Sequence, residues 1–397
     1  MSDAAEAAIV GFVAEQHQRL VGLRRDIHTH PELGRHEFRT TTLLAEALMA
    51  AGLAPAPLPG GTGLICDIGQ RPATVGLRAD LDALPISDGK DVPYRSTVEG
   101  VCHACGHDVH IAVVLGAGLV LARLAAAGEL TIGVRLVFQP AEEVIPGGAL
   151  DVIDAGGLDG LERMYAVHCD PAIEVGRIGL RVGAVTSATD SLEVRLSGPG
   201  GHTARPHRTA DLVAAIGDLV ARVPGVLARR VDPRAGINLV FGEVHAGSAG
   251  NVIPRTGVAR GTLRMLDRAA WETVPPVLDA AIREVVAPYG VDVEINHVRG
   301  VPPVVNDASA VAELATSAAR LSADAACHTE QSLGGEDFGW FLEKVPGALA
   351  RLGVRAPGSA QAVDLHQPTF DVDEGCIDVG VRLLAGVALV RAAARDA

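Results

Sequence analysis

The nine residues 102–110, CHACGHDVH, concentrate side chains that bind metal ions. Cys105 and His107 stand two positions apart, and Gly106 between them permits the turn that lets a thiolate and an imidazole face one ion. A buried cysteine beside a surface histidine is the ordinary alternative for such a pair. The density of donors in so short a run favours a metal site over that alternative.

Cys102 and Cys105 also form a CxxC spacing, which occurs in zinc knuckles and in thiol-redox proteins. No second CxxC follows in the sequence, which disfavours a closed four-cysteine zinc site. The pair also lacks a thioredoxin-like βαβ frame around it. A thiol-redox protein therefore stays a minor alternative, and a failure to reduce disulfides would discard it.

Glu142 and Glu143 follow the apolar, strand-like run TIGVRLVFQP at residues 131–140. Open α/β sheets bind ligands at the carboxyl ends of their strands, so this position favours a functional site over a solvated acidic loop. At a strand exit both side chains can turn toward one site. One carboxylate would then bind metal while the other acts as general base.

His168 ends the strand-like run ERMYAVHC, and His366 lies in a loop before Pro368. Each histidine alone is more often structural than functional. A site for two metal ions needs about five ligands, and the candidates are Cys105, His107, Glu143, His168 and His366. This mixture of thiolate, imidazole and carboxylate suits divalent ions such as zinc, manganese, cobalt or nickel.

Asp80 and Asp82 end the run TVGLRAD and its following turn. We favour Asp80 as a carboxylate that orients a ligand histidine or hydrogen-bonds near the metals, whereas capping of a loop explains Asp82 equally well. Farther along, His202 lies in the glycine-rich GPGGHTARPH, where an exposed turn histidine is an equal alternative. Asn251 and Arg264 are further polar candidates. An arginine at 264 can bind a substrate carboxylate through two hydrogen bonds, but an ordinary surface arginine of a strand is a strong alternative.

The elements that must position these residues alternate between strands and helices up to residue 185 and again from 299. This pattern predicts an α/β domain with a mostly parallel sheet covered by helices on both faces. Residues 186–298 instead read as β-α-β-β-α-β, the order of a ferredoxin-like domain. We therefore expect a catalytic domain in two parts, 1–185 and 299–397, with a lid domain inserted at 186–298.

The 397 residues are enough for two cores, and a formal net charge of −14 argues against nucleic-acid and anionic-membrane partners. Six cysteines are too sparse for a disulfide framework. The acidic N-terminus lacks the basic and apolar regions of a secretory signal. The longest apolar run, residues 111–122, is too short to cross a bilayer, so we expect a soluble, cytoplasmic protein.

Several motifs together resemble one known family, in the same order from about residue 20 to the C-terminus. They are HTHPEL, LRADLDALPI, CHACGHDVH, FQPAEE, GPGGHTARPH, NVIP, GTLR, GGEDFGWFLEKVPGALARLG and LHQPTF. The sequence resembles the amidohydrolase branch of the aminoacylase and carboxypeptidase metallopeptidases, which includes hippurate hydrolases, N-acyl amino acid amidohydrolases and auxin-conjugate hydrolases.

The resemblance implies two divalent metal ions per chain on the five ligands above, and a homodimer formed through the lid domain. It implies Glu142 as general base and acid, and His202 as a stabiliser of the tetrahedral intermediate in the partner subunit's site. Asn251 and Arg264 would bind the carboxylate of an N-acyl amino acid substrate. Glu336 in GGEDF would be a supporting or structural residue.

Two alternatives stay open beside an N-acyl amino acid amidohydrolase: a dipeptidase or carboxypeptidase with the same centre, and a metal- or peptide-binding homologue without catalysis. Cys102 departs from the apolar residue that relatives often have. We hypothesise that Cys102 can form a disulfide with Cys105, so that mild oxidant inactivates the enzyme unless Cys102 is replaced by alanine.

Overall fold

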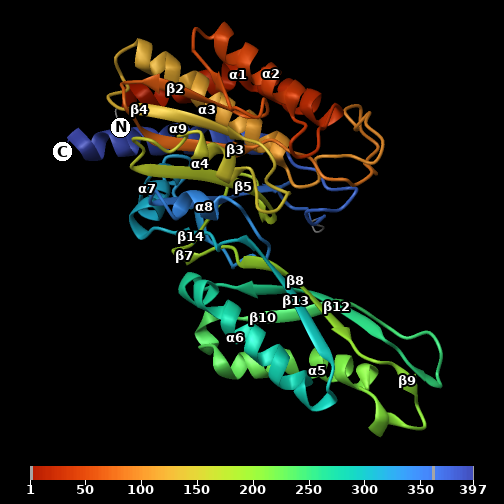
Figure 1. The fold of residues 1–397 in the computed structure, drawn as a ribbon. Helices are drawn as coiled ribbons and strands as arrows, with labels where there is room; N and C mark the ends of the chain where they lie inside the picture. The colour runs from red at the N-terminus through yellow and green to blue at the C-terminus, as the bar shows by residue number, and fades with distance from the viewer. Residues whose placement is uncertain (1–2, 360–362, 397) are drawn as a thin grey trace. The chain divides into compact units, whose positions relative to one another are not determined.

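The computed structural model describes residues 3–359 and 363–396, which form two compact units. Unit 1 comprises residues 1–185, 305–330 and 337–397, and unit 2 comprises residues 186–304 and 331–336. Figure 1 shows the helices and strands that make up each unit.

Unit 1 is built on an eight-stranded sheet in the order β1–β2–β4–β3–β5–β16–β6–β15. The strands are β1 (Ala56–Pro57), β2 (Leu64–Gly69), β3 (Ala73–Asp80), β4 (Gly133–Gln139), β5 (Arg163–Glu174), β6 (Ile178–Leu180), β15 (Ala326–His328) and β16 (Gly347–Arg355). The four central strands β4, β3, β5 and β16 pair in parallel, while β2 and β6 join this core in antiparallel pairs. The predicted mostly parallel sheet is therefore confirmed.

Helices cover the sheet of unit 1. They are α1 (Asp3–Thr29), α2 (Phe38–Ala50), α3 (His107–Ala126), α4 (Ala149–Asp154), α7 (Ala308–Ala318), α8 (Gly339–Leu342) and α9 (Gly375–Asp396). All eight residues of β3 are buried, so both faces of the sheet are covered at its centre. Helix α3 packs against α1, α9 and the sheet.

Helix α3 is apolar around most of its circumference because it lies in the core. By length and composition it is the one helix among the described residues that could cross a membrane, but 72% of its most apolar window is buried inside the protein. Gly118 lets α3 approach β4 closely, since a Cβ there would lie 2.3 Å from Leu136 Cδ1. The predicted buried helix after the Cys/His cluster is thus α3.

Unit 2 has the order β8 (Ala188–Ser197), α5 (Leu212–Arg230), β10 (Asn238–Ala246), β12 (Thr256–Met265), α6 (Arg268–Val286) and β13 (Asp292–Val301). Its four strands form an antiparallel sheet in the order β10–β12–β8–β13. Alternate residues of β8, including Leu192, Val194 and Leu196, are buried, as expected for a sheet with helices on one face. The short strands β9 (Gly201–His202) and β11 (Val252–Ile253) pair separately.

The chain leaves unit 1 after β7 (Gly183–Ala184) and returns through β14 (Val305–Asn306), which pairs antiparallel with β7. The second boundary of the insertion lies at 304/305, whereas the sequence placed it at 298/299. Residue 298 falls inside β13, next to a break in its register at Val298–Val301. The alternation of half-buried and exposed residues stops at this irregularity, before the strand ends. The predicted domain boundary was therefore placed at the end of the alternation and not at the end of the unit.

Candidate metal centre

The five predicted ligands come from four separate parts of unit 1. Cys105 and His107 flank the start of α3, Glu143 lies in the turn after β4, His168 lies in β5, and His366 lies in the loop before α9. Donor atoms of Cys105, His107 and His168 all lie within 4.8 Å of one another, as do those of Cys105, Glu143 and His366. The structure therefore brings all five together as two groups that share Cys105, an arrangement suited to two neighbouring cations.

Gly106 makes the approach of Cys105 and His107 possible. Its φ of +89° lies in the left-handed region, and it caps the N-terminus of α3 so that His107 is the first helical residue. A Cβ on Gly106 would lie 2.7 Å from the sulfur of Cys169. Both the backbone conformation and the space therefore require glycine between the two ligands.

The ring of His107 is oriented for metal binding. Its Nδ1 donates a hydrogen bond to the carbonyl oxygen of Asp82 at 2.8 Å. Its Nε2 has no hydrogen-bond partner among residues 3–359 and 363–396, and lies 3.7 Å from a carboxylate oxygen of Asp80 and 3.8 Å from one of Glu142. A buried imidazole held by one nitrogen, with the other turned toward carboxylates, is what a metal-ligating histidine presents.

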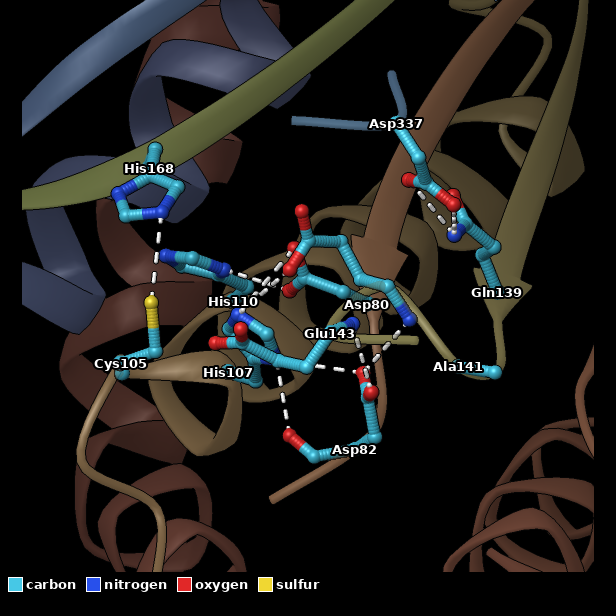
Figure 2. Close-up of polar contacts among 12 residues, drawn as sticks. Asp80, Asp82, Cys105, His107, His110, Gln139, Ala141, Glu143, His168 and Asp337 are labelled. Atoms are coloured by element: carbon cyan, nitrogen blue, oxygen red, sulfur yellow. Dashed lines mark hydrogen bonds and ion pairs between the residues drawn. The ribbon is translucent and has the colours of Figure 1, made fainter. Parts of the chain in front are cut away.

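His168 is held in the same manner. Its Nδ1 donates to the carbonyl of Cys169 at 2.9 Å, and its Nε2 lies 3.6 Å from the sulfur of Cys105 (Figure 2). His366 places its Nε2 3.2 Å from a carboxylate oxygen of Glu143. The free nitrogens of these rings thus point to the shared group of donors.

The electrostatics of the cluster also fit cations. Burial opposes a charge on His107, but Asp80 and Cys105 outweigh it and raise the pKa of this histidine well above its usual range. Hydrogen bonds to Cys105 and Glu143 raise the pKa of His366 to about 10. Anionic donors that draw protons onto neighbouring imidazoles attract divalent ions by the same field, so a metal ion bound here would release protons.

Asp80 is wholly buried and uses both oxygens in fixed contacts. One accepts from Nδ1 of His110 at 2.6 Å and the other from Arg78 at 2.7 Å. Burial would raise its pKa, but Arg78, His107 and His110 together hold it well below the usual range. Asp80 is therefore suited to orienting its neighbours as an anion, and not to exchanging a proton during a reaction.

Sequence reasoning missed the network behind Asp80. Arg78 also donates to Asp337 at 2.8 Å and to Gln139 at 2.8 Å. The Gln139 amide donates to Asp337 at 2.7 Å (Figure 2). All of these side chains are buried. An arginine inside a strand that is otherwise apolar was the available signal. The sequence suggested Glu336 of the GGEDF motif as a supporting residue. In the structure Asp337 of the same motif accepts the hydrogen bonds of this network.

Asp82 also has a structural function that the sequence did not reveal. Its two carboxylate oxygens accept the backbone N–H groups of Glu142 at 3.0 Å and Glu143 at 2.9 Å. Its carbonyl holds His107, as described above. One aspartate therefore fixes both the Glu142–Glu143 pair and a ligand histidine, which exceeds the capping role that its position in the sequence suggested.

Cys102 lies in a small apolar cluster with Leu84, Ala104 and Cys105, and its side chain is not exposed. Burial raises the pKa of its thiol to about 11. Because the thiolate is the form that attacks and is oxidised, these surroundings disfavour the hypothesis of a readily formed Cys102–Cys105 disulfide.

The three candidate residues of unit 2 do not form one group. His202 is exposed in β9 and lies opposite Val252, and Asn251 is exposed just before β11. Arg264 in β12 lies opposite Thr189 at the other end of β8, and donates to the Thr189 hydroxyl and the Leu333 carbonyl. Arg264 thus lies near one end of the ten-residue strand β8 and His202 lies past the other end, a span of about 30 Å.

Comparisons with known proteins agree with this architecture. A model of peptidase family M20/M25/M40 matches residues 76–390. The chain is 36% identical, over 91% of its length and 85% of the relative, to a protein of Bacillus subtilis (strain 168) named N-acetyl-L-cysteine deacetylase. A crystal structure from Bacillus subtilis, described as a dinuclear metal-binding peptidase from the M20 family, superimposes with a TM-score of 0.83 at 33% identity and covers 96% of this chain and 99% of that chain.

A further relative is longer than this chain. It is a protein of Rhodococcus jostii (strain RHA1) named putative glutamate–cysteine ligase 2-3, and it is 48% identical over 376 residues. The match covers 94% of this chain but 46% of that protein, so the chain spans about half the length of this relative.

Proposed function

Since the chain belongs to peptidase family M20/M25/M40, we propose that it hydrolyses the amide bond of N-acyl amino acids with two divalent metal ions. The observation that carries the proposal is the pair of donor groups sharing Cys105, with Glu142 beside them at 3.8 Å from Nε2 of His107. Manganese, zinc, cobalt and nickel all suit these donors.

The chain's own residues supply positioning and proton transfer. Bound divalent ions would contribute Lewis acidity, which polarises a carbonyl and lowers the pKa of a water molecule. Cys105, His107, Glu143, His168 and His366 would hold the ions. Glu142, whose side chain is 8% exposed, accepts the proton of the attacking water and delivers it to the leaving nitrogen of the amide.

Among N-acyl amino acids we place N-acylcysteines first. One relative is named for the deacetylation of N-acetyl-L-cysteine, which yields cysteine. The longer relative is named for a ligase that joins glutamate to cysteine, which consumes cysteine. A hydrolase that releases cysteine is consistent with both names.

The lid role of unit 2 and the dimer are part of this proposal. His202 and Arg264 lie at opposite ends of β8, about 30 Å apart, which is too far for both to touch one small substrate from within the same chain. If both act on substrate, a second copy of the chain must contribute one of them. Asn251 precedes Val252, which pairs with His202, so Asn251 lies on the His202 side of this span. We propose that Arg264 of one chain and Asn251 of a second copy bind the substrate carboxylate, and that His202 of that second copy serves the same metal centre.

The test is a substrate panel on protein reconstituted with manganese, zinc, cobalt or nickel, with metal content measured alongside. N-acetyl-L-cysteine, other N-acetyl amino acids and N-benzoylglycine are compared with unblocked dipeptides by the amine that is released. We expect the blocked amino acids to be cleaved fastest. Preferential cleavage of free dipeptides would identify a peptidase instead, and no cleavage of any amide with two metals bound would identify a binding protein.

A further inference from the structure

The turn that carries Glu142 and Glu143 needs support from outside itself. It begins after β4 ends at Gln139, so its N–H groups are not bound by a sheet. Ala141 has a φ of +54°, a left-handed conformation that is costly for a residue with a Cβ. Two adjacent side chains also tend to diverge, so directing both carboxylates to one centre requires a fixed backbone.

A glutamate far away in the sequence provides part of that support. Oε1 of Glu37 accepts the backbone N–H of Ala141 at 2.7 Å. Since Asp82 accepts the next two N–H groups, three consecutive amides, 141 to 143, are each bound by a carboxylate. Glu37 and Asp82, which lie in two different segments of the chain, therefore both hydrogen-bond to the turn.

Stabilisation of its own helix does not explain the burial of Glu37. Glu37 is the N-cap residue of α2, yet its side chain makes no capping hydrogen bond to that helix. The residue is 0% exposed, and Oε2 has no hydrogen-bond partner in the described part of the chain. Glu37 is buried, does not cap its own helix, and binds the turn that carries Glu142 and Glu143. The burial of this acid is therefore best explained by its hydrogen bond to that turn.

The segment before Glu37 packs against the same turn. A Cβ on Gly34 would lie 2.7 Å from Cγ2 of Val144, 3.2 Å from Oδ2 of Asp82 and 3.3 Å from the Cα of Ala141. The carbonyl of Glu32 accepts the N–H of Ala83 at 2.8 Å, which ties this segment to the residue after Asp82. Residues 32–37 thus contact both the turn that carries Glu142 and Glu143 and the segment that contains Asp82.

From these contacts we propose that Glu37 is a positioning residue for the reaction: with Asp82 it fixes the backbone of residues 141–143 so that Glu142 and Glu143 point into one centre. The proposal rests on the proposed function of that centre. Glu37 touches neither substrate nor metal in this role, and it acts through the N–H of Ala141.

The test compares Glu37→Ala with Glu37→Gln at saturating metal. Alanine removes the acceptor, and we expect kcat to fall at least tenfold with KM within threefold of wild type, because a displacement of about 1 Å at a reacting group can cost about 10²-fold. Glutamine keeps an acceptor oxygen and should restore kcat to near wild type. Independently of activity, the peptide spanning 139–145 should exchange its amide hydrogens faster in Glu37→Ala and no faster in Glu37→Gln.

Leu48→Ala is the matched control. Leu48 is a buried residue of α2, the helix that Glu37 precedes, and it packs in the hydrophobic core instead of binding the turn. It should destabilise the protein with kcat unchanged. If Glu37→Ala does not fold, Gly34→Ala displaces the turn with the carboxylate in place and should also lower kcat. A kcat for Glu37→Ala within twofold of wild type, or unchanged exchange at 139–145, overturns the proposal. An inactive wild type would instead overturn the proposed function.

Discussion

Glu142 and Cys105 lie in one cluster, and the proposed function assigns them separable tasks, proton transfer to Glu142 and metal binding to Cys105. Replacing Glu142 by glutamine removes the proton acceptor and leaves every proposed ligand in place. We expect kcat to fall about 10²–10⁴-fold with two metals still bound. Metal analysis of the purified variant alongside its kinetics checks this, and a near wild-type kcat would contradict the assignment of Glu142.

Cys105→Ala should have the opposite signature. Cys105 belongs to both donor groups, so its loss weakens both metal sites at once. We expect substoichiometric metal in the purified variant, and activity that follows the metal added. Full metal content at wild-type affinity would exclude Cys105 as a shared ligand.

Glu37 also predicts a dependence of stability on pH. Burial raises the pKa of this carboxyl from 4.5 to about 7 in the folded protein. Between these two values the folded state holds more of its proton than the unfolded state does, so the free energy of unfolding falls as pH rises from about 4.5 to about 7 and stays lower above. A shift of this size corresponds to on the order of 3 kcal/mol.

Urea unfolding of metal-free wild type and Glu37→Gln at pH 5, 6, 7 and 8 measures this contribution, because other titrating groups cancel in the difference. The variant should gain stability relative to wild type as pH rises toward 7, and the gap should be constant above that. A gap that is the same at pH 5 and pH 8 would contradict the raised pKa.

The residues that sequence analysis found belong to a local sequence motif, whereas those that it missed act on partners far away in the sequence. Cys105 and His107 stand in a dense local motif, whereas Glu37 acts on an amide 104 positions away and Asp82 on one 60 positions away. The partners of Glu37 and Asp82 are backbone N–H groups, which have no side-chain identity to read. Spacing along a sequence therefore identifies donors to a metal but not the residues that hold the loops carrying them.

At the level of elements, the packing of α3 on β4 depends on a glycine. A Cβ at Gly118 would lie 2.3 Å from a methyl group of the buried Leu136. Gly118→Ala should gain up to about 1 kcal/mol of helix propensity and lose about 1–3 kcal/mol to overpacking, so we expect a lower Tm. Gly11→Ala is the control, because a Cβ there meets nothing within 4 Å in helix α1, and it should raise Tm slightly. An equal rise in both variants would show that α3 has room at this position.

Strands and helices were predictable where one rule of burial held along the whole element. The strands of the parallel core are mostly apolar on both faces, and α3 is apolar around most of its circumference, so both types stand out in the sequence. The end of β13 was not predictable from its alternation, because the register break near Val298 interrupts the pattern inside the strand. The regular strands and helices could thus be predicted from the sequence. The end of β13 could not, because its irregularity is visible only in the pairing of β13 with β8.

For the whole molecule, metal and stability should be linked. A ligand that binds only the folded state stabilises it by about 2.7 kcal/mol at a hundredfold excess over its Kd. Dialysis against a strong chelator should therefore abolish activity and lower Tm, and added divalent metal should restore both. Undiminished activity after exhaustive chelation would refute a metal mechanism.

Assembly can be tested without an assay for activity. We expect a homodimer, with a mass by sedimentation about twice the 40.9 kDa of one chain. A monomer at micromolar concentration would remove the proposed contribution of His202 to a partner's centre.

The paired strands β7 and β14 have a consequence for how residues 185–304 are attached to unit 1. At this insertion the chain departs from unit 1 and re-enters it through two adjacent antiparallel residue pairs, Ala184 opposite Val305 and Gly183 opposite Asn306. Their separation of about 5 Å is one that a two-residue hairpin turn can close. A turn in place of residues 185–304 would therefore keep the pairing of β7 with β14, but residues 331–336, which belong to unit 2, would lose contacts such as that of Leu333 with Arg264.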